Sequence, residues 1–276
     1  MQWQGSTRGE PVDWDDAYAN AAYIPGADMY PDRWRSDADD FRTRLAVLNR
    51  ARLGVMYGHG TREIVDLFQP DKPAQGTMIF VHGGYWRRFD GSLWSHFSQG
   101  ALNSGWTVAM PTYDLAPRVR IADITRQIAQ AVCVVANEHP GPLRLVGHSA
   151  GGHLVARMLD PEVLPPEIST RIEKVVPISP VSDLRPLLNT TMNDDFKMDE
   201  AAAKAESPVF MAPPSTPVTV WVGADERPVF LDQARWLADA WGCERIEVPG
   251  KHHFDVIDGL KDPDSPLMRS ILASTA

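Results

Sequence analysis

The stretch Leu-Arg-Leu-Val-Gly-His-Ser-Ala-Gly-Gly at residues 143–152 decides the fold of this 276-residue chain. Its first four residues are mostly apolar and have the length of a buried strand, and the residues from Gly152 to Leu159 show a helical pattern. A strand that passes through a short glycine-rich turn directly into a helix is half of a parallel crossover unit. The stretch therefore predicts a domain of the α/β class.

Further strands and helices alternate on both sides of this stretch. Strand-sized, mostly apolar runs lie at 78–81, 108–110, 175–178, 218–222 and 245–248. Residues 121–138 carry apolar side chains at a three-to-four spacing, and residues 228–241 form another helical pattern with Pro in a tolerated first-turn position. We expect a doubly wound, mostly parallel sheet with helices on both faces, whose ligands bind beyond the carboxyl ends of the strands.

Length and composition favour a single domain over residues 1–276. A chain of this size with 43% apolar residues can bury one sizeable core. Residues 1–60 show no strong period apart from a helix-like stretch at 33–49, and we expect them to wrap around the domain. Residues 182–217, rich in Met, Asp and Pro, interrupt the alternation, so we expect a small lid-like insertion over the strand ends.

Charge and composition exclude several kinds of partner. The formal net charge of -9 disfavours a nucleic-acid backbone or an anionic membrane surface, because both attract clustered Lys and Arg. Neither a secretory apolar segment nor a membrane-spanning run is present. We expect a soluble cytoplasmic protein that acts on a small molecule, and the sequence leaves a homodimer open.

The cysteines and histidines predict no cofactor. Cys133 and Cys243 lie in apolar-looking segments without metal-ligand spacing, so we expect buried free thiols in a reducing compartment. The histidines show no zinc-type spacing, and no Gly-x-Gly-x-x-Gly or Walker loop follows a strand. We therefore expect neither a metal centre nor a nucleotide cofactor.

Ser149 lies at the strand-to-helix turn and is the candidate nucleophile. In such a sharp turn side chains at Gly147 and Gly151 would clash with neighbouring backbone, and the turn leaves the hydroxyl projecting above the sheet. The helix that begins there directs free N–H groups at developing negative charge, among them the N–H of Ala150. The alternative is a glycine-rich turn with an incidental serine, which the flanking strand and helix disfavour.

A second glycine-rich loop, His-Gly-Gly-Tyr-Trp at 82–86, follows the strand at 78–81. Glycine lets the main chain approach a substrate carbonyl closely, so the N–H groups of Gly83 or Gly84, together with that of Ala150, are the candidate oxyanion donors. The alternative is an ordinary tight turn. The aromatic residues Tyr85 and Trp86 of this loop, with Phe254, are candidate walls of the substrate pocket.

A serine nucleophile needs a base, and the base needs a carboxylate partner. His252 and His253 are the candidate bases, because they lie in a loop just after the strand at 245–248. Asp225 and Glu226 are the candidate acids, because they follow the strand at 218–222. The residues themselves leave both choices open.

The two glycine-rich motifs resemble those of the arylformamidase (kynurenine formamidase) branch of the α/β hydrolases, near the hormone-sensitive-lipase-like esterases. The resemblance covers the chain from about Asp66 onward, and residues 15–20 look like N-terminal segments of bacterial members often described only as esterases. Those esterases usually have a third glycine where Tyr85 stands here. This difference favours the formamidase-like branch.

The resemblance implies roles for individual residues. It favours His253 as the base, three residues after Gly250, and Glu226 as the acid, two residues before Pro228. The implied activity is hydrolysis of a small ester or N-formyl amide, such as an N-formylkynurenine-like substrate, through an acyl-enzyme. A general small-ester carboxylesterase is the first alternative, and a non-catalytic ligand-binding protein on the same fold is a remote one.

Overall fold

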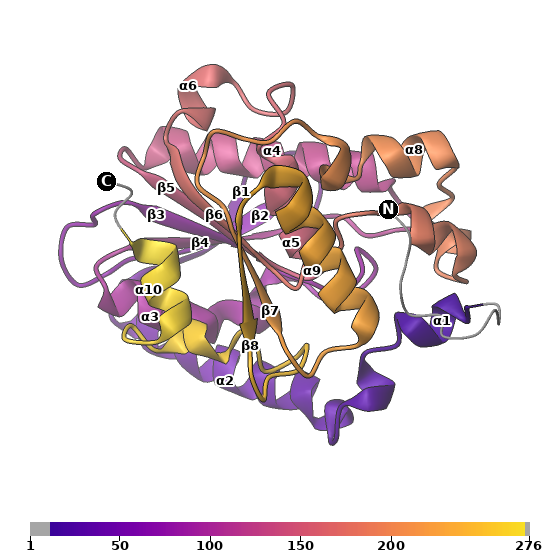
Figure 1. Cartoon of the computed structure of the whole chain (residues 1–276). Coiled ribbons are helices and arrows are strands. Elements are labelled where there is room, and N and C mark those ends of the chain that lie inside the picture. Colours follow the sequence, from indigo (N-terminus) through magenta and orange to yellow (C-terminus); the bar gives the residue numbers. More distant parts are fainter. Residues whose placement is uncertain (1–11, 274–276) are drawn as a thin grey trace.

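The computed structural model describes residues 12–273 and contains a sheet of eight strands in the order β1-β2-β4-β3-β5-β6-β7-β8 (Figure 1). The strands are β1 Ala51–Met56, β2 Ile64–Phe68, β3 Thr77–Val81, β4 Thr107–Thr112, β5 Leu143–His148, β6 Ile172–Ile178, β7 Thr219–Gly223 and β8 Glu244–Val248. Only β2 runs antiparallel to its neighbours, and the other pairings are parallel. The predicted doubly wound, mostly parallel α/β sheet is confirmed.

Helices cover both faces of the sheet. The α-helices are α1 Trp14–Ala17, α2 Tyr30–Val47, α3 Gln99–Asn103, α4 Ile121–Glu138, α5 Ala150–Arg157, α6 Pro166–Ser169, α7 Asn193–Phe196, α8 Glu200–Ala205, α9 Pro228–Trp241 and α10 Pro266–Leu272. The 3-10 helices are η1 Ala21–Tyr23, η2 Ala27–Met29, η3 Gly91–Ser98, η4 Arg185–Asn189, η5 Pro208–Phe210 and η6 Asp258–Lys261. Helices α4, α5 and α9 pack on one face and α2, α3 and α10 on the other, so each central strand has an apolar layer on both sides.

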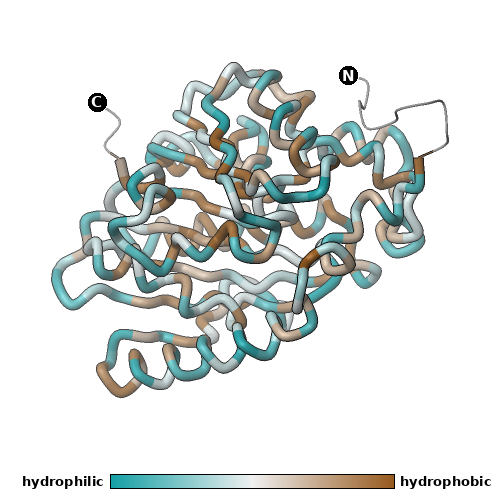
Figure 2. Tube along the Cα trace, turned by 60° about the horizontal axis from the view of Figure 1, so that its bottom comes forward, coloured by the Kyte–Doolittle hydropathy of each residue, from teal (hydrophilic) through white to brown (hydrophobic). Residues whose placement is uncertain are grey.

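Strand β3 illustrates how alternation divides the core. Ile79 and Val81 belong to the cluster formed with α4, α5 and α9, whereas Met78 and Phe80 belong to the cluster on the opposite face. All five residues of β3 are buried. In Figure 2 the interior segments mix brown, tan and white, and the turns of the outer helices alternate between teal and brown. Within residues 12–273, no helix is both long and apolar enough to cross a membrane.

The N-terminal third departs from the expectation of a wrapping segment. Residues 51–56 form β1, an edge strand with mostly exposed residues, and β2 joins it to the rest of the sheet. Because β1 is exposed over most of its length, it does not require the continuous apolar run that marks a strand buried on both faces. Residues 12–30 do lie across the domain surface, whereas residues 1–11 of the expected segment lie outside the described residues.

The insertion at 182–217 contains η4, α7, α8 and η5. Its apolar residues, including Leu187, Phe196 and Ala203, are buried in the core cluster of α4, α5 and α9. Ser182 also bonds to Gln233 of α9 through both its backbone N–H and its hydroxyl. The insertion is therefore packed as part of the core, and whether it moves as a lid stays a prediction.

Candidate active site

Ser149 occupies a strained turn between β5 and α5. Its φ of 57° and ψ of -117° lie outside the regions that L-residues ordinarily occupy. The surroundings enforce this conformation: a side chain on Gly147 would overlap the carbonyl of Gly151, and one on Gly151 would overlap the carbonyl of Val81. The Ser149 N–H is held by Ile178 O at 2.8 Å. The turn thus presents the hydroxyl at the carboxyl end of β5.

The loop after β3 lies against this serine. A Cβ atom on Gly83 would come within 3.0 Å of the Ser149 Cβ, so only glycine allows so close an approach. Gly84 has a φ of +115°, a backbone conformation that favours glycine. None of the N–H groups of Gly83, Gly84 and Ala150 donates a hydrogen bond to the described part of the chain. Free N–H groups around a serine can stabilise an oxyanion.

Glu226 and His253 form a buried pair at the ends of β7 and β8. His253 Nδ1 lies 2.5 Å from Glu226 Oε2, and both side chains are almost entirely inaccessible to water. The other carboxylate oxygen of Glu226 accepts from the Gly223 N–H at 2.9 Å and from the Ser179 hydroxyl. Because the carboxylate accepts the Nδ1 proton, Nε2 of His253 remains free to act as a base.

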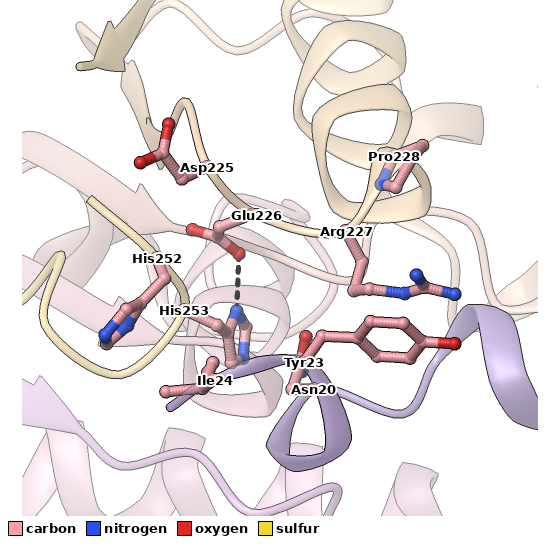
Figure 3. Close-up of a pocket in the computed structure, with 9 residues that line it drawn as sticks. All are labelled: Asn20, Tyr23, Ile24, Asp225, Glu226, Arg227, Pro228, His252 and His253. Carbon is pink, nitrogen blue, oxygen red and sulfur yellow. Dashed lines mark hydrogen bonds and ion pairs between the residues drawn. The ribbon is translucent and has the colours of Figure 1, made fainter. Parts of the chain in front are cut away.

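The competing candidates lie elsewhere. Asp225 is exposed, and its side chain points away from the pair in Figure 3. His252 Nδ1 accepts from the N–H groups of Phe254 and Asp255 at 3.1 and 3.3 Å, and its Nε2 lies 3.2 Å from the Tyr30 hydroxyl. Asp225 and His252 therefore do not face each other, whereas Glu226 and His253 do.

His148, next to the serine, connects it to the histidine loop. Its Nε2 lies 2.9 Å from the His253 carbonyl oxygen, and the two rings are 4.8 Å apart. Burial, with the nearby His253 as a second cause, holds the pKa of His148 well below its usual value. His148 therefore stays neutral.

The contact between the serine and His253 is not formed in this structure. Within residues 12–273 the Ser149 hydroxyl forms no hydrogen bond with His253, and such bonds are often loose before substrate binds.

Two cavities adjoin these residues. The larger, of about 730 Å³, is bounded by residues of the N-terminal segment, by Gly84 and Tyr85 of the loop after β3, by Met192 of the insertion, and by Phe254. The smaller, of about 270 Å³, opens on Glu226 and His253 and is shown in Figure 3. The predicted wall residues Tyr85 and Phe254 thus line the larger cavity.

Trp86 was expected to line the substrate pocket, and this expectation is wrong. Its side chain is fully buried and packs edge-on against His153 and Phe196, with ring centroids 5.0 and 5.7 Å apart. Both Tyr85 and Trp86 have positive φ values near 52°, so the loop reverses direction at this point. Burying the large indole against the insertion stabilises the loop more than exposing it to a cavity would.

Sequence reasoning missed three residues of the site. Ser179 directly follows β6 and bonds to Glu226, and its position at a strand end was an available signal. His148 stands next to the serine in the sequence, but no motif gives it a role there. Asn20 lines both cavities, but nothing in its local sequence indicates this because it lies far from the serine in the chain.

No metal centre is evident in the described part of the chain. No group of three or more His, Cys, Asp or Glu side chains among residues 12–273 could hold a metal ion. Cys133 and Cys243 are free thiols, although both are half-buried rather than buried as expected. The groups that the structure brings together at the site are the serine, the histidine, the carboxylate and the backbone N–H groups.

Comparisons with known proteins agree with this fold. A family model described as alpha/beta hydrolase fold matches residues 78–240, more than half of the chain. Kynurenine formamidase of Salmo salar is 28% identical over 271 residues, which cover 88% of this chain and 92% of that protein. Kynurenine formamidase of Drosophila melanogaster is 28% identical over 236 residues, covering 77% of this chain and 78% of that protein.

Solved structures give the same result. The crystal structure of a "putative thioesterase" from Silicibacter sp. TM1040 is 58% identical, with a TM-score of 0.93, and covers 95% of this chain and 100% of that chain. The apo form of Thermogutta terrifontis esterase 2 is 20% identical, with a TM-score of 0.64, and covers 80% and 91% of the two chains. The second likeness shows the fold alone.

Proposed function

The chain belongs to the α/β-hydrolase family, and on that premise we propose that it is a serine hydrolase with Ser149 as nucleophile, His253 as base and Glu226 as acid. The observation that carries the proposal is the buried Glu226–His253 pair beside the strained turn at Ser149. A serine, a carboxylate and a histidine, in that order along the chain, are the triad arrangement of this fold. The proposed reaction is acyl transfer to water.

The first step forms the acyl-enzyme. His253 Nε2 takes the proton from the Ser149 hydroxyl as Oγ attacks the substrate carbonyl carbon. Negative charge then develops on the carbonyl oxygen, where the N–H groups of Gly83, Gly84 and Ala150 stabilise it. Glu226 stabilises the imidazolium that forms and keeps its Nδ1 proton directed at the carboxylate.

Collapse of the tetrahedral intermediate completes the acyl-enzyme, and its hydrolysis then regenerates the enzyme. The His253 imidazolium donates its proton to the leaving nitrogen or oxygen as the bond to the carbonyl carbon breaks. Water, deprotonated by His253, then attacks the acyl carbon, and Ser149 leaves with the returned proton. The products are a small acid and an amine or an alcohol.

We propose an N-formyl aromatic amide, of the N-formylkynurenine type, as the preferred substrate class. The names of the 28%-identical kynurenine formamidases support it, as does the aromatic boundary that Tyr85 and Phe254 give to the larger cavity. A small ester is the first alternative. The name of the 58%-identical "putative thioesterase" adds a thioester as a further candidate.

The experiment that tests the catalytic proposal combines labelling with kinetics. A fluorophosphonate probe should label the wild-type protein and not Ser149→Ala, and the variant should lose roughly four to six orders of magnitude in kcat. Labelling of Ser149→Ala, or near wild-type turnover by it, would overturn the proposal. Absence of labelling and turnover in the folded wild-type protein would favour the non-catalytic binding alternative.

A substrate panel tests the proposed substrate class. The values of kcat/KM for an N-formyl aromatic amine, p-nitrophenyl acetate and an acyl thioester compare transition-state binding of the three classes. Each value is divided by the uncatalysed rate constant of the same compound. The amide should then show the greatest rate enhancement, and a greater enhancement for either ester would replace the formamidase proposal.

We also propose a cytoplasmic location and a small-molecule partner. The free thiols of Cys133 and Cys243 support a reducing compartment, and the net charge of -9 disfavours polyanionic partners. The oligomeric state, including a homodimer, is testable by light scattering. Cell fractionation with an antibody to the chain checks the location.

A further inference from the structure

Asn20 carries a buried polar atom without a partner. The residue is only 6% exposed, and its Oδ1 accepts no hydrogen bond from any described residue. Its Nδ2, in contrast, donates to the Tyr85 hydroxyl at 3.3 Å. A buried amide oxygen left without a donor costs free energy, so it requires an explanation.

Tyr85 fixes which way the amide of Asn20 faces. The Tyr85 hydroxyl donates its proton to the Tyr18 carbonyl oxygen at 2.6 Å, so it can only accept from Asn20. Burial raises the pKa of Tyr85 well above its usual value, so that proton is retained. The NH2 group of Asn20 must therefore face Tyr85, and the carbonyl oxygen must face away from it.

Asn20 lies between the loop that carries Gly84 and the Glu226–His253 pair. It lines the larger cavity together with Gly84 and Tyr85, and it lines the smaller cavity together with Glu226 and His253. Figure 3 shows its side chain rising from the N-terminal segment into the pocket that His253 also enters. A leaving group attached to the attacked carbonyl must lie in this region to receive the proton of His253.

We propose that Asn20 Oδ1 accepts a hydrogen bond from the N–H of an amide leaving group and thereby makes the site selective for amides over esters. This inference rests on the proposed serine hydrolase function. The nitrogen of the tetrahedral intermediate carries one hydrogen and one lone pair. Asn20 accepts the hydrogen, which turns the lone pair towards His253.

The proposed step conserves atoms and charge. The lone pair takes the proton of the His253 imidazolium, the C–N bond breaks, the neutral amine leaves, and the acyl group remains on Ser149. An ester has no hydrogen on its leaving oxygen, so an ester substrate leaves Asn20 Oδ1 buried and unpaired. A site built to accept a substrate N–H discriminates against analogues that lack it.

The test compares three formyl compounds that differ at one position. Formanilide has the leaving-group N–H, N-methylformanilide has the amide without it, and phenyl formate has an ester oxygen. Asn20→Leu keeps the approximate size of the side chain and removes the acceptor. We expect kcat/KM for formanilide to fall about tenfold to a hundredfold, and the values for the other two compounds to change by less than about threefold.

Controls separate recognition from structural damage. Asn103→Leu replaces an exposed asparagine on the last turn of α3, and all three kcat/KM values should stay unchanged. A thermal unfolding scan of each variant shows whether the fold survives. Tyr85→Phe removes the group that orients Asn20, so it should lower the formanilide value selectively but by a smaller factor than Asn20→Leu does.

The outcomes distinguish this inference from the proposed function. An equal loss for all three compounds in folded Asn20→Leu would mean that Asn20 only supports the pocket, and no loss for any of them would mean that another group binds the leaving nitrogen. Either result overturns the inference and leaves the triad proposal intact, provided that Ser149→Ala abolishes turnover. Turnover that survives in Ser149→Ala overturns the proposed function itself.

Discussion

The turn at Ser149 and the N-terminal segment at residues 13–30 both contribute to the candidate site but are held by different interactions. The turn lies between β5 and α5, where neighbouring backbone excludes any side chain at Gly147 and Gly151. The segment is attached mainly through side chains, as in the bond from Tyr85 to the Tyr18 carbonyl and the ion pair of Arg227 with Asp16. The candidate chemistry therefore sits on the rigid core, and the candidate specificity sits on a peripheral segment.

The largest expected effect is on kcat and concerns the candidate catalytic residues on the core. Glu226→Gln preserves shape but presents an NH2 group or a neutral oxygen to His253, which disturbs its tautomer and leaves the imidazolium unsupported. We expect kcat to fall about 10³- to 10⁴-fold. Asp225→Asn, one residue earlier and exposed, should leave kcat within about twofold. Steady-state kinetics of both variants checks the assignment, and the reverse ranking would make Asp225 the acid.

A pair of glycine variants compares the two regions directly. Gly151→Ala forces a methyl group into the Val81 carbonyl, so the backbone must shift and we expect a loss of at least about 3 kcal/mol in unfolding free energy. Gly26→Ala in the N-terminal segment meets only the flexible end of Met29 at 2.8 Å and a φ of +68°, so we expect a loss of about 1 kcal/mol. Urea denaturation measures both, and equal losses would refute the contrast.

Acid should lower the free energy of unfolding through the buried histidines of the core, and not through the N-terminal segment. Burial lowers the pKa of His82 to about 4 and of His153 to about 3, whereas residues 13–30 contain no histidine. Because these folded-state pKa values lie below the unfolded value of about 6.5, the unfolded chain binds more protons. Their contribution to stability is complete above about pH 6.5 and is lost as the pH falls towards 4.

The slope of that loss is measurable. As the pH falls from about 6.5 towards 4, each such histidine should lower the unfolding free energy by about 1.4 kcal/mol per pH unit. Denaturation of the wild-type protein and of His153→Gln between pH 7 and 4.5 gives the slopes. The variant should have a slope smaller by one proton, and identical slopes would mean that His153 is protonated in the folded state.

The smallest expected effect concerns the attachment of the segment. Arg227 pairs with Asp16 at 2.7 Å and stacks on the Tyr23 ring at 3.5 Å, as Figure 3 shows for the ring. Arg227→Gln should loosen the segment and raise KM about two- to fivefold with little change in kcat, since exposed ion pairs contribute little. Arg235→Gln, on the surface of α9, is the matched control and should leave KM unchanged. A fall in kcat alone would assign Arg227 to the chemistry instead.

The sequence predicted the central strands well and the edge poorly. Strands β3, β5 and β7 are buried along their whole length, so they appear as apolar runs that need no partner to be identified. Strand β1 was missed because its residues are mostly exposed at the sheet edge and need not be apolar. Strand β2 is buried from Val65 to Phe68, but it is short and carries Asp66 within its apolar run. Trp86 was misplaced because a loop sequence does not show which way a side chain turns after consecutive positive φ values.

By itself the sequence determined the turn at Ser149, because a strand, two glycines and a helix that are contiguous in the chain suffice to form it. The residue pattern left two adjacent candidates for the base, His252 and His253, and two for the acid, Asp225 and Glu226. The tertiary structure brings His253 and Glu226 together across 27 residues. The pairing depends on how the loops after β7 and β8 turn side by side. The position of Asn20 beside His253 was decided in the same way, because contacts between residues distant in the chain leave no local pattern.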